Sequence, residues 1–258
     1  MDLKLKGKVA IVTGASRGLG RAIAFGLGDE GCRLVICARG EEPLRRTENE
    51  LKERGVEVQA LVLDVTDDGA ADTLLETAHR FAPPSVVVGN VGGNRRGQLT
   101  ELSDEDWREI FDLNFQSQVS LARASAKSMI ENEIQGSIVF VSSIFGREAG
   151  GAGLSIYNAS KSALISMSKI LALELAPHGI RANTVAPGSI RFPGGSWDRR
   201  CKEDPEGMKT FIEANLPLGR FGRAEEIADA VTFLSSQRAS LVTGTCWNVD
   251  GGQSRSLI

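Results

Sequence analysis

Short apolar runs rich in β-branched residues alternate with longer segments of helical periodicity along all 258 residues of the chain. The first two runs, residues 9–12 and 34–37, flank a helical segment that ends near residue 30. A strand, a helix and a second parallel strand form the unit from which doubly wound sheets are built. Few polar residues interrupt the runs, as is typical of strands that helices cover on both faces. The alternation therefore predicts a parallel sheet.

The same pattern continues to the end of the chain and gives the fold class. We expect strands over residues 9–12, 34–37, 58–63, 86–88, 137–141, 182–185 and 245–249, and further helices over 42–54, 70–81, 104–131, 157–175 and 224–234. The length and the 41% hydrophobic content suffice for one large core. The prediction is an α/β protein of one domain, residues 1–258, with a doubly wound, seven-stranded parallel sheet and helices on both faces.

One segment departs from this rhythm. Residues 189–215 follow the sixth predicted strand and contain two prolines, three glycines, three arginines, Phe192 and Trp197. A long insertion of this kind is either a lid over a site or an irregular surface loop. Ligands of doubly wound sheets bind at the carboxyl ends of the strands, so the position favours a substrate lid.

Composition excludes several classes of function. The net charge of -3, from 30 basic and 33 acidic residues, gives no electrostatic footprint for nucleic acid. The only two histidines, His79 and His178, have no second histidine or cysteine at ligand spacing, so no metal site is predicted. The four cysteines form no C-x-x-C pair, and neither a signal region nor a membrane-spanning run is present. We expect a cytoplasmic protein that has reduced thiols and acts on a small molecule.

A glycine-rich turn follows the first predicted strand and opens the first helix. Its sequence is Thr13-Gly14-Ala15-Ser16-Arg17-Gly18-Leu19-Gly20. Glycines permit a sharp turn and a close approach of phosphate, and the helix N-terminus offers free N–H groups to a pyrophosphate. A plain tight turn is the alternative. Residues 14–18 also match the G-x-S-x-G nucleophile elbow, but a hydrolase places strands before it that are missing here.

A tyrosine and a lysine lie four residues apart in the helix predicted over 157–175. Tyr157 is the only tyrosine, and Lys161 shares its helix face. A charge about 4 Å away is worth about 4 kcal/mol at an effective dielectric near 20, which would lower the pKa of the phenol towards neutral pH. The pair therefore predicts a general acid-base group, with a half-buried ring beside a solvated ammonium as the alternative.

Together with Asn114 and Ser143, these motifs make the whole chain resemble the short-chain dehydrogenase/reductase family, in particular its 3-oxoacyl-acyl-carrier-protein-reductase-like branch. The resemblance implies a Rossmann fold and an active-site set of Asn114, Ser143, Tyr157 and Lys161. It also implies a cofactor site formed by Gly14, Ser16, Arg17, Gly18, Leu19, Gly20, Arg39, Asp64, Val65, Asn90, Gly92, Tyr157, Lys161, Pro187, Gly188 and Ile190.

The chain departs from the family pattern at three positions. Gly89 and Val91 replace the first asparagine and the alanine of the family's N-N-A-G, so the turn around Asn90 can differ in shape. Phe192 stands where the family commonly has a threonine that contacts the cofactor. We expect the lid to be anchored in another way.

The choice of cofactor follows from charge at the end of the second strand. An enzyme that selects NAD usually has a carboxylate there, whereas a 2′-phosphate requires positive charge. The strand ends in Cys37-Ala38-Arg39, with Arg17 in the glycine-rich turn. Two guanidinium groups predict NADP. The alternative is that Arg39 faces solvent.

The resemblance also implies a mechanism. Ser143 hydrogen-bonds the substrate oxygen, Tyr157 exchanges a proton with it, and Lys161 holds the cofactor ribose and lowers the pKa of Tyr157. Asn114 supports a water-linked proton path. Ser142 is the alternative candidate for the serine that contacts the substrate. Ser143 is preferred because it stands three residues before Gly146, as in the family pattern.

The resulting prediction is an NADP-dependent oxidoreductase that acts on a ketone or secondary alcohol. A nicotinamide-binding sensor and a 3-oxoacyl thioester reductase are the alternatives; Glu131 and Glu133 would repel an acidic carrier protein. Arg95, Arg96, Arg147 and Arg191 could favour an anionic substrate. The resemblance implies a homotetramer or homodimer that forms through the helices at 104–131 and 157–175.

Overall fold

The computed structural model describes residues 1–257, and within them the predicted seven-stranded parallel sheet is confirmed. The strands are β1 (Val9–Thr13), β2 (Arg33–Ala38), β3 (Val58–Val62), β4 (Val86–Gly89), β5 (Ser137–Val141), β6 (Arg181–Pro187) and β7 (Cys246–Val249). Their order in the sheet is β3-β2-β1-β4-β5-β6-β7, and each neighbouring pair is parallel. The order reverses direction between β1 and β4, where doubly wound sheets bind their ligands.

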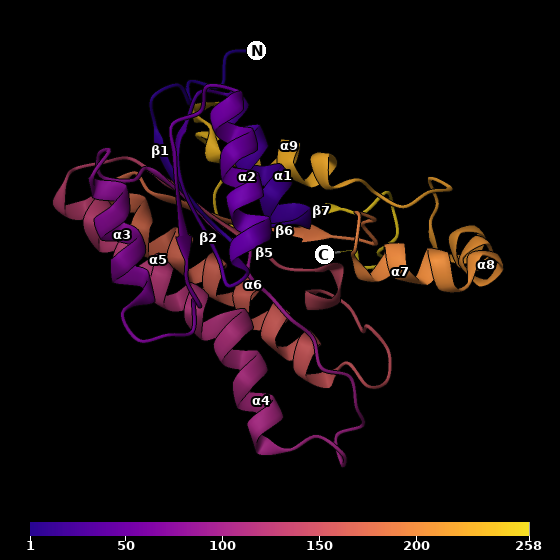
Figure 1. Ribbon diagram of the computed structural model, residues 1–258. Coiled ribbons are helices and arrows are strands. Elements are labelled where there is room, and N and C mark those ends of the chain that lie inside the picture. The colour runs from indigo at the N-terminus through magenta and orange to yellow at the C-terminus, as the bar shows by residue number, and fades with distance from the viewer. Residues whose placement is uncertain (258) are drawn as a thin grey trace.

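Helices cover both faces of the sheet (Figure 1). The face of α1 and α9 also carries α2, and the opposite face carries α3, α5 and α6. The bounds are α1 (Gly18–Asp29), α2 (Glu41–Glu53), α3 (Ala70–His79), α4 (Asp104–Phe111), α5 (Ser117–Glu131), α6 (Ser155–Leu175), α7 (Ser196–Glu203), α8 (Pro205–Asn215) and α9 (Ala224–Ser235). Shorter turns of 3-10 helix lie at Ile144–Gly146, Ala176–His178 and Gln237–Ala239.

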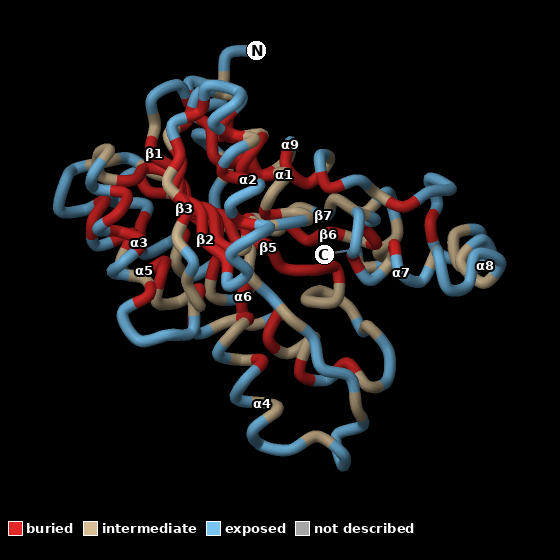
Figure 2. Tube along the Cα trace, in the orientation of Figure 1, coloured by how far each residue is buried: buried red, intermediate tan, exposed pale blue. Residues whose placement is uncertain are grey.

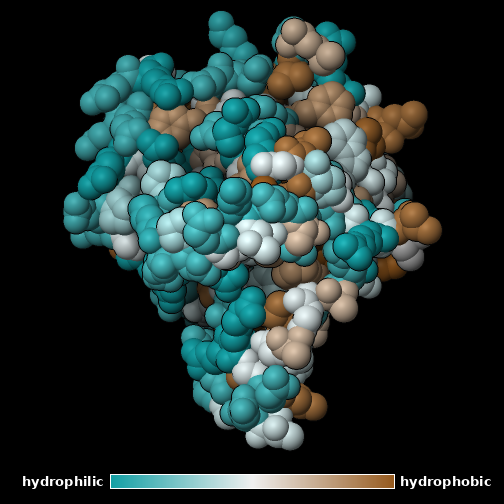
Figure 3. Space-filling view, turned by 90° about the vertical axis from the view of Figure 1, so that its right-hand side faces the viewer, coloured by the Kyte–Doolittle hydropathy of each residue, from teal (hydrophilic) through white to brown (hydrophobic). Residues whose placement is uncertain are grey.

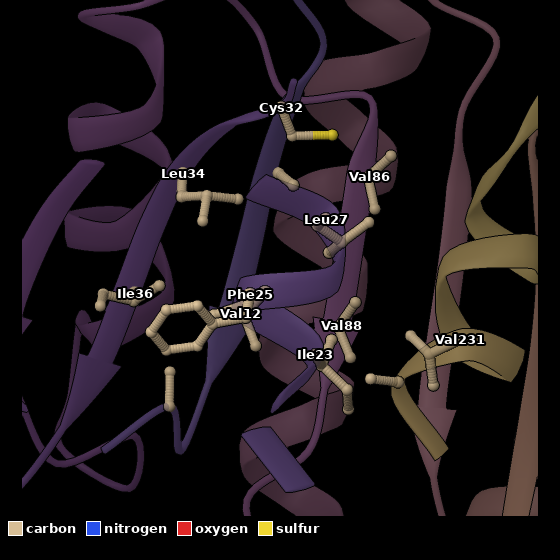
Figure 4. Close-up of a cluster of buried hydrophobic side chains, with 14 of the residues drawn as sticks. Val12, Ile23, Phe25, Leu27, Cys32, Leu34, Ile36, Val86, Val88 and Val231 are labelled. Carbon is tan, nitrogen blue, oxygen red and sulfur yellow. The ribbon is translucent and has the colours of Figure 1, made fainter. Parts of the chain in front are cut away.

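Successive residues of a strand contribute side chains to two separate hydrophobic cores, one on each face of the sheet. Val12 packs with Ile23 of α1 and Val231 of α9, whereas its neighbour Ile11 packs on the side of α3 and α5. Figure 4 shows the first of these clusters, with side chains from the sheet and both helices pointing towards one another. The buried trace in Figure 2 follows the strands, while exposed segments lie at the rim. Because helices pack on both faces of the sheet, a ligand site can form at the ends of the strands, and doubly wound sheets form it at their carboxyl ends.

The helix predicted over 104–131 is divided into three parts. A π-helical turn, Asp112–Gln116, separates α4 from α5. Its buried member Asn114 points into the protein and bonds to groups of two other segments. Such π-turns often mark functional positions, and the helical periodicity of the sequence gave no sign of this one.

Residues 189–215, which the sequence predicted as a lid without assigning a helix to them, hold two helices, α7 and α8. Asp204 caps α8 by accepting a hydrogen bond from Gly207 N, and Pro205 occupies the first helical turn. Trp197, Phe211 and Phe221 pack together, with centroid distances of 4.7–6.2 Å. These helices project to one side of the sheet (Figure 1). Figure 3 shows that side of the molecule: hydrophobic atoms gather towards one edge of this face, while the other edge is mainly hydrophilic.

Among the described residues, every helix is too short or too polar to cross a membrane.

Candidate active site

The glycine-rich turn between β1 and α1 has a shape that only glycine allows at two positions. Gly14 has φ +68°, and a Cβ on Gly20 would lie 2.3 Å from the Gly14 carbonyl oxygen. No side chain caps the first turn of α1, so backbone N–H donors remain without a side-chain partner beside the groove that the turn borders. This arrangement suits a bound phosphate.

Asn90, just after β4, fixes the turn from the neighbouring strand. Its backbone N–H donates to Thr13 Oγ1 at 3.0 Å, and its side-chain Nδ2 donates to the Thr13 carbonyl at 2.9 Å. The two strands on either side of the switch point are thereby joined at their carboxyl ends. The turn is held without any ligand contact.

A groove of about 570 Å³ runs across this switch point, a volume within the usual range for cofactor sites. It is lined by ten of the predicted cofactor residues: Gly14, Ser16, Arg17, Leu19, Gly20, Arg39, Asp64, Val65, Asn90 and Gly92. The other six, Gly18, Tyr157, Lys161, Pro187, Gly188 and Ile190, do not line it. Ile190 is buried in the core and packs on Gly222 instead.

At one end of the groove Arg39 forms an ion pair with Asp64, at 3.3 Å. The sequence argument found no carboxylate near Arg39, because Asp64 reaches it from the end of β3. Partial burial opposes ionisation of Asp64, but hydrogen bonds from Thr66 and the charge of Arg39 lower its pKa. A guanidinium has five N–H donors, so Arg39 keeps donors for a phosphate. Its side chain is 70% exposed at the rim.

Tyr157, Ser143 and Lys161 meet beside the groove. The Ser143 hydroxyl follows β5 and hydrogen-bonds the Tyr157 phenol. The Lys161 ammonium lies 6.0 Å from the centroid of the tyrosine ring. A Cβ on Gly92, which lines the groove, would lie 3.0 Å from Lys161 Nζ. The cluster therefore lies beside the groove, with Lys161 next to Gly92.

Burial has the largest effect on the pKa values of Tyr157 and Lys161. Burial raises the pKa of Tyr157, and the hydrogen bond from Ser143 only partly opposes it. Burial also lowers the pKa of Lys161 to about 8. The pKa of Tyr157 is therefore raised, whereas the sequence argument expected Lys161 to lower it; Lys161 Nζ donates to the Val141 carbonyl at 2.9 Å and does not offset the burial of the phenol.

Asn114 joins the loop after β4 to α6, the helix that carries Tyr157 and Lys161. Its Oδ1 accepts from Gly93 N at 2.7 Å, and its Nδ2 donates to Gly93 O and to Ser160 Oγ, both at 2.9 Å. Ser160 lies between Tyr157 and Lys161 in α6. Asn114 thereby fixes the loop after β4 to the helix that carries the tyrosine.

Sequence reasoning missed Asn158, which follows Tyr157 directly. Its Nδ2 donates to the carbonyl oxygens of Phe145 at 2.6 Å and Glu148 at 2.8 Å. The loop that begins at Ser143 is thus tied to α6 one residue from the phenol. The only signal in the sequence was this adjacency.

Comparisons with known proteins agree with this geometry. Residues 14–254 match a family model described as "Enoyl-(Acyl carrier protein) reductase". The 3-oxoacyl-[acyl-carrier-protein] reductase of Salmonella typhimurium is 37% identical over 251 residues, which cover 97% of this chain and 98% of that protein. The (3R)-3-hydroxyacyl-CoA dehydrogenase of Rattus norvegicus is 36% identical over 260 residues, with the same coverage. The crystal structure of L-sorbose reductase from Gluconobacter frateurii, complexed with NADPH and L-sorbose, superposes with a TM-score of 0.94 at 33% identity and covers 100% of both chains.

The chain belongs to the short-chain dehydrogenase/reductase family. As a short-chain dehydrogenase/reductase it is an oxidoreductase, and its fold is the Rossmann fold of the structures it matches. Tyr157 contacts Ser143 and lies near Lys161, and Asn114 is bonded to Ser160 of the same helix, α6.

In this short-chain dehydrogenase/reductase, Ser142 and Ser143 have different surroundings. Ser142 Oγ is buried and donates to the Lys161 carbonyl at 2.9 Å, whereas the Ser143 hydroxyl reaches the phenol. This arrangement supports the preference for Ser143 as the group that faces substrate.

Gln118 occupies the space that Gly89 leaves open. A Cβ on Gly89 would lie 2.3 Å from Gln118 Oε1, and Gln118 Nε2 donates to the Val91 carbonyl at 2.9 Å. The departure from the family's N-N-A-G is therefore filled by a side chain of α5.

Phe192 provides the contact between the insertion and the glycine-rich turn. A Cβ on Gly18 would lie 2.7 Å from two atoms of the Phe192 ring, and the same ring lines the groove. Asp198 stabilises this turn by accepting from Lys202, Gly194 N and Arg191, which hold the pKa of Asp198 at about 2.

Three of the four arginines proposed for an anionic substrate are bound to other groups of the protein, and the fourth, Arg96, is exposed. Arg95 pairs with Asp106 and Glu109, Arg147 with Cys246 O and Asn248, and Arg191 with Asp198. Within residues 1–257, no group of three or more His, Cys, Asp or Glu side chains could hold a metal ion.

Proposed function

We propose that this protein transfers a hydride between NADP(H) and a ketone or secondary alcohol, with Tyr157 as the general acid or base. The observation that carries the proposal is the cluster of Ser143, Tyr157 and Lys161, in which Lys161 lies next to Gly92 of the groove. A sensor would need the groove but no proton donor beside it.

The groove fits the proposed cofactor. The N-terminus of α1 and the close approach at Gly14 and Gly20 suit the diphosphate. Arg17 and Arg39 supply positive charge for a 2′-phosphate, and Asp64 and Val65 border the place of the adenine. Lys161 would hold the ribose next to the nicotinamide, and Pro187, Gly188 and Ile190 would border that ring from outside the groove.

When bound, the nicotinamide supplies or accepts the hydride. The Ser143 hydroxyl donates a hydrogen bond to the substrate oxygen and fixes its position. Tyr157 donates its phenolic proton to that oxygen as negative charge develops on it, or accepts the alcohol proton in the reverse direction. The Lys161 ammonium stabilises the tyrosinate that remains. Asn114, bonded to Gly93 and Ser160, holds this end of α6 and lies on the proposed water-linked path by which the proton is replaced.

Residues 189–215 act, in this proposal, as a lid on the one domain of residues 1–258. The contact of Phe192 with Gly18 supports this role, because it joins the insertion to the glycine-rich turn. The lid would exclude water from the reacting groups.

NADPH oxidation with a panel of ketones tests the proposal in wild type and Tyr157→Phe. We expect the variant to lose at least about 100-fold in kcat/KM, the usual contribution of a general acid, while NADPH still binds. Equal rates in the two proteins would overturn it. Tight NADPH binding without turnover of any ketone or alcohol would instead favour the sensor.

Reduction of 3-oxoacyl thioesters is a second candidate, favoured by the names of the curated relatives. The acidic end of α5, with Glu131 and the exposed Glu133, argues against an acidic carrier protein. Comparing kcat/KM for a 3-oxoacyl-CoA and for a free ketose separates the two candidates.

We further propose a homotetramer or homodimer that forms through α4, α5 and α6, and a cytoplasmic location. Exposed Ile130, Ile170 and Leu173 on α5 and α6 support association. The four free cysteines suit a reducing compartment. Sedimentation velocity of wild type and Leu173→Glu tests the interface: the variant should dissociate, and an unchanged sedimentation coefficient would place the interface elsewhere.

A further inference from the structure

A second cavity, of about 280 Å³, lies at the edge of the sheet opposite to the cofactor groove. Residues at the starts of four strands line it: Lys8 before β1, Ser85 before β4, Gly136 before β5 and Arg181 at the start of β6. Ser235 and Ser236 at the end of α9 also line it. The cavity is therefore separate from the site described above.

The charged residues that line this cavity all have the same sign. They are Lys4, Lys8 and Arg181, and no aspartate or glutamate lines the cavity. None of the three side chains forms an ion pair in the part of the chain that the structure describes. The nearby carboxylate of Asp2 accepts the backbone N–H of Lys4, at 2.8 Å.

Arg181 is a partly buried guanidinium without a counter-charge. It donates only to the carbonyl oxygens of Val242, at 3.1 Å, and Ser236, at 2.9 Å. Burial lowers its pKa to about 10, which still leaves it charged at neutral pH. A partly buried cation of this kind is normally matched by an anion.

Ser85 is a second, uncharged feature of this cavity that points to a ligand. The residue is only 7% exposed, and its buried Oγ has no hydrogen-bond partner. A buried hydroxyl without a partner is destabilising and uncommon, whereas an acceptor in the cavity would satisfy it.

We propose that this cavity is a binding site for a phosphate monoester of a small polar molecule. Lys4, Lys8 and Arg181 match the two negative charges of a phosphate monoester, and Ser85 donates a hydrogen bond to it. The cavity has room beyond a phosphate group, and the amides of Gln135 and Gln237 offer hydrogen bonds to the rest of the ligand.

Isothermal titration with glycerol 3-phosphate tests the site in the full-length protein. Lys4→Gln combined with Lys8→Gln removes two charges from the cavity, and Lys6→Gln is the matched control, because Lys6 lies in the same segment but does not line the cavity. We expect the double variant to bind at least tenfold more weakly than wild type and the control to bind within twofold of it. Saturating NADPH should leave binding in place, since the two sites lie at opposite edges of the sheet.

Ser85→Ala is a second variant, which removes one hydroxyl without changing charge, and it should also weaken binding. Inorganic phosphate should bind more weakly than the ester, and glycerol should not bind. No binding by wild type, equal binding by wild type and the double variant, or loss of binding when NADPH is added would overturn the proposal. Equal affinity for phosphate and glycerol 3-phosphate would contradict the choice of a monoester.

Discussion

Lys161 illustrates how burial and function compete at a single residue. The residue is 3% exposed, and its ammonium donates to one carbonyl oxygen, that of Val141. Burial favours the neutral amine and sets the pKa near 8, below the ordinary value of 10.5. In this fold the charge that the mechanism needs is therefore maintained against a cost in stability.

That cost gives a pH dependence with a definite sign. Between pH 8 and 10 the unfolded chain keeps the Lys161 proton while the folded protein releases it, so folding becomes more favourable as pH rises. We expect the free energy of unfolding of wild type to gain roughly 2 kcal/mol relative to Lys161→Met over this interval. Urea denaturation of both proteins at several pH values measures the difference. Parallel curves for the two proteins would show that Lys161 is not a buried, titrating amine.

The adjacent serines should separate stability from catalysis. Ser142→Ala removes the donor to the Lys161 carbonyl and should cost about 1 kcal/mol of unfolding free energy with little change in kcat/KM. Ser143→Ala removes the hydroxyl beside the phenol and should lower kcat/KM by about 100-fold or more with a small change in stability. Steady-state kinetics and urea denaturation of both variants provide the check. A large loss of kcat/KM in Ser142→Ala, with little change in Ser143→Ala, would show that Ser142 is the serine that faces the substrate.

At the scale of elements, Phe192 stands where the family commonly has a threonine that contacts the cofactor, and it makes a different contact. The ring lies against Gly18 at the start of α1 and lines the groove. Its turn is held by the buried Asp198 through Gly194 N, Arg191 and Lys202. The apolar ring thereby joins the insertion to the glycine-rich turn.

Removing this ring should weaken cofactor binding. We expect Phe192→Ala to raise the Kd for NADPH by roughly tenfold, equivalent to about 1.4 kcal/mol, and Phe192→Leu to retain most of the affinity. Fluorescence titration with NADPH measures both. An unchanged or tighter Kd in Phe192→Ala would mean that the ring does not help to hold the cofactor.

The π-turn at Asp112–Gln116 is the clearest departure from the predicted elements. Periodicity predicted a continuous helix because the flanking segments α4 and α5 are both regular. The extra residue in the turn is decided by contacts that are distant in sequence, from Asn114 to Gly93 and Ser160. Local propensity contains no information about such contacts.

At the scale of the whole molecule, the sheet could be predicted because alternating apolar runs reflect burial on both faces, as at Ile11 and Val12. Parallel strands bring their carboxyl ends to one edge, so the meeting of the glycine-rich turn with Asn90 was predictable as well. The sequence could not predict the Arg39–Asp64 pair or the packing of Gln118 over Gly89, because each contact joins side chains from separate elements. The sequence did not predict the helices of residues 189–215, because glycines and prolines, which usually indicate loops, begin and separate them.

The protonation of Tyr157 in the assembled site tests the central claim most directly. As the only tyrosine, it gives a single NMR signal when the protein carries tyrosine labelled with carbon-13 at Cζ. Without cofactor we expect a pKa above 10.0, the ordinary value, because burial dominates. With saturating NADP⁺, the positive nicotinamide ring together with Lys161 should bring the pKa below that value. A pKa at or above 10.0 in both titrations would contradict the role of Tyr157 as the general acid or base.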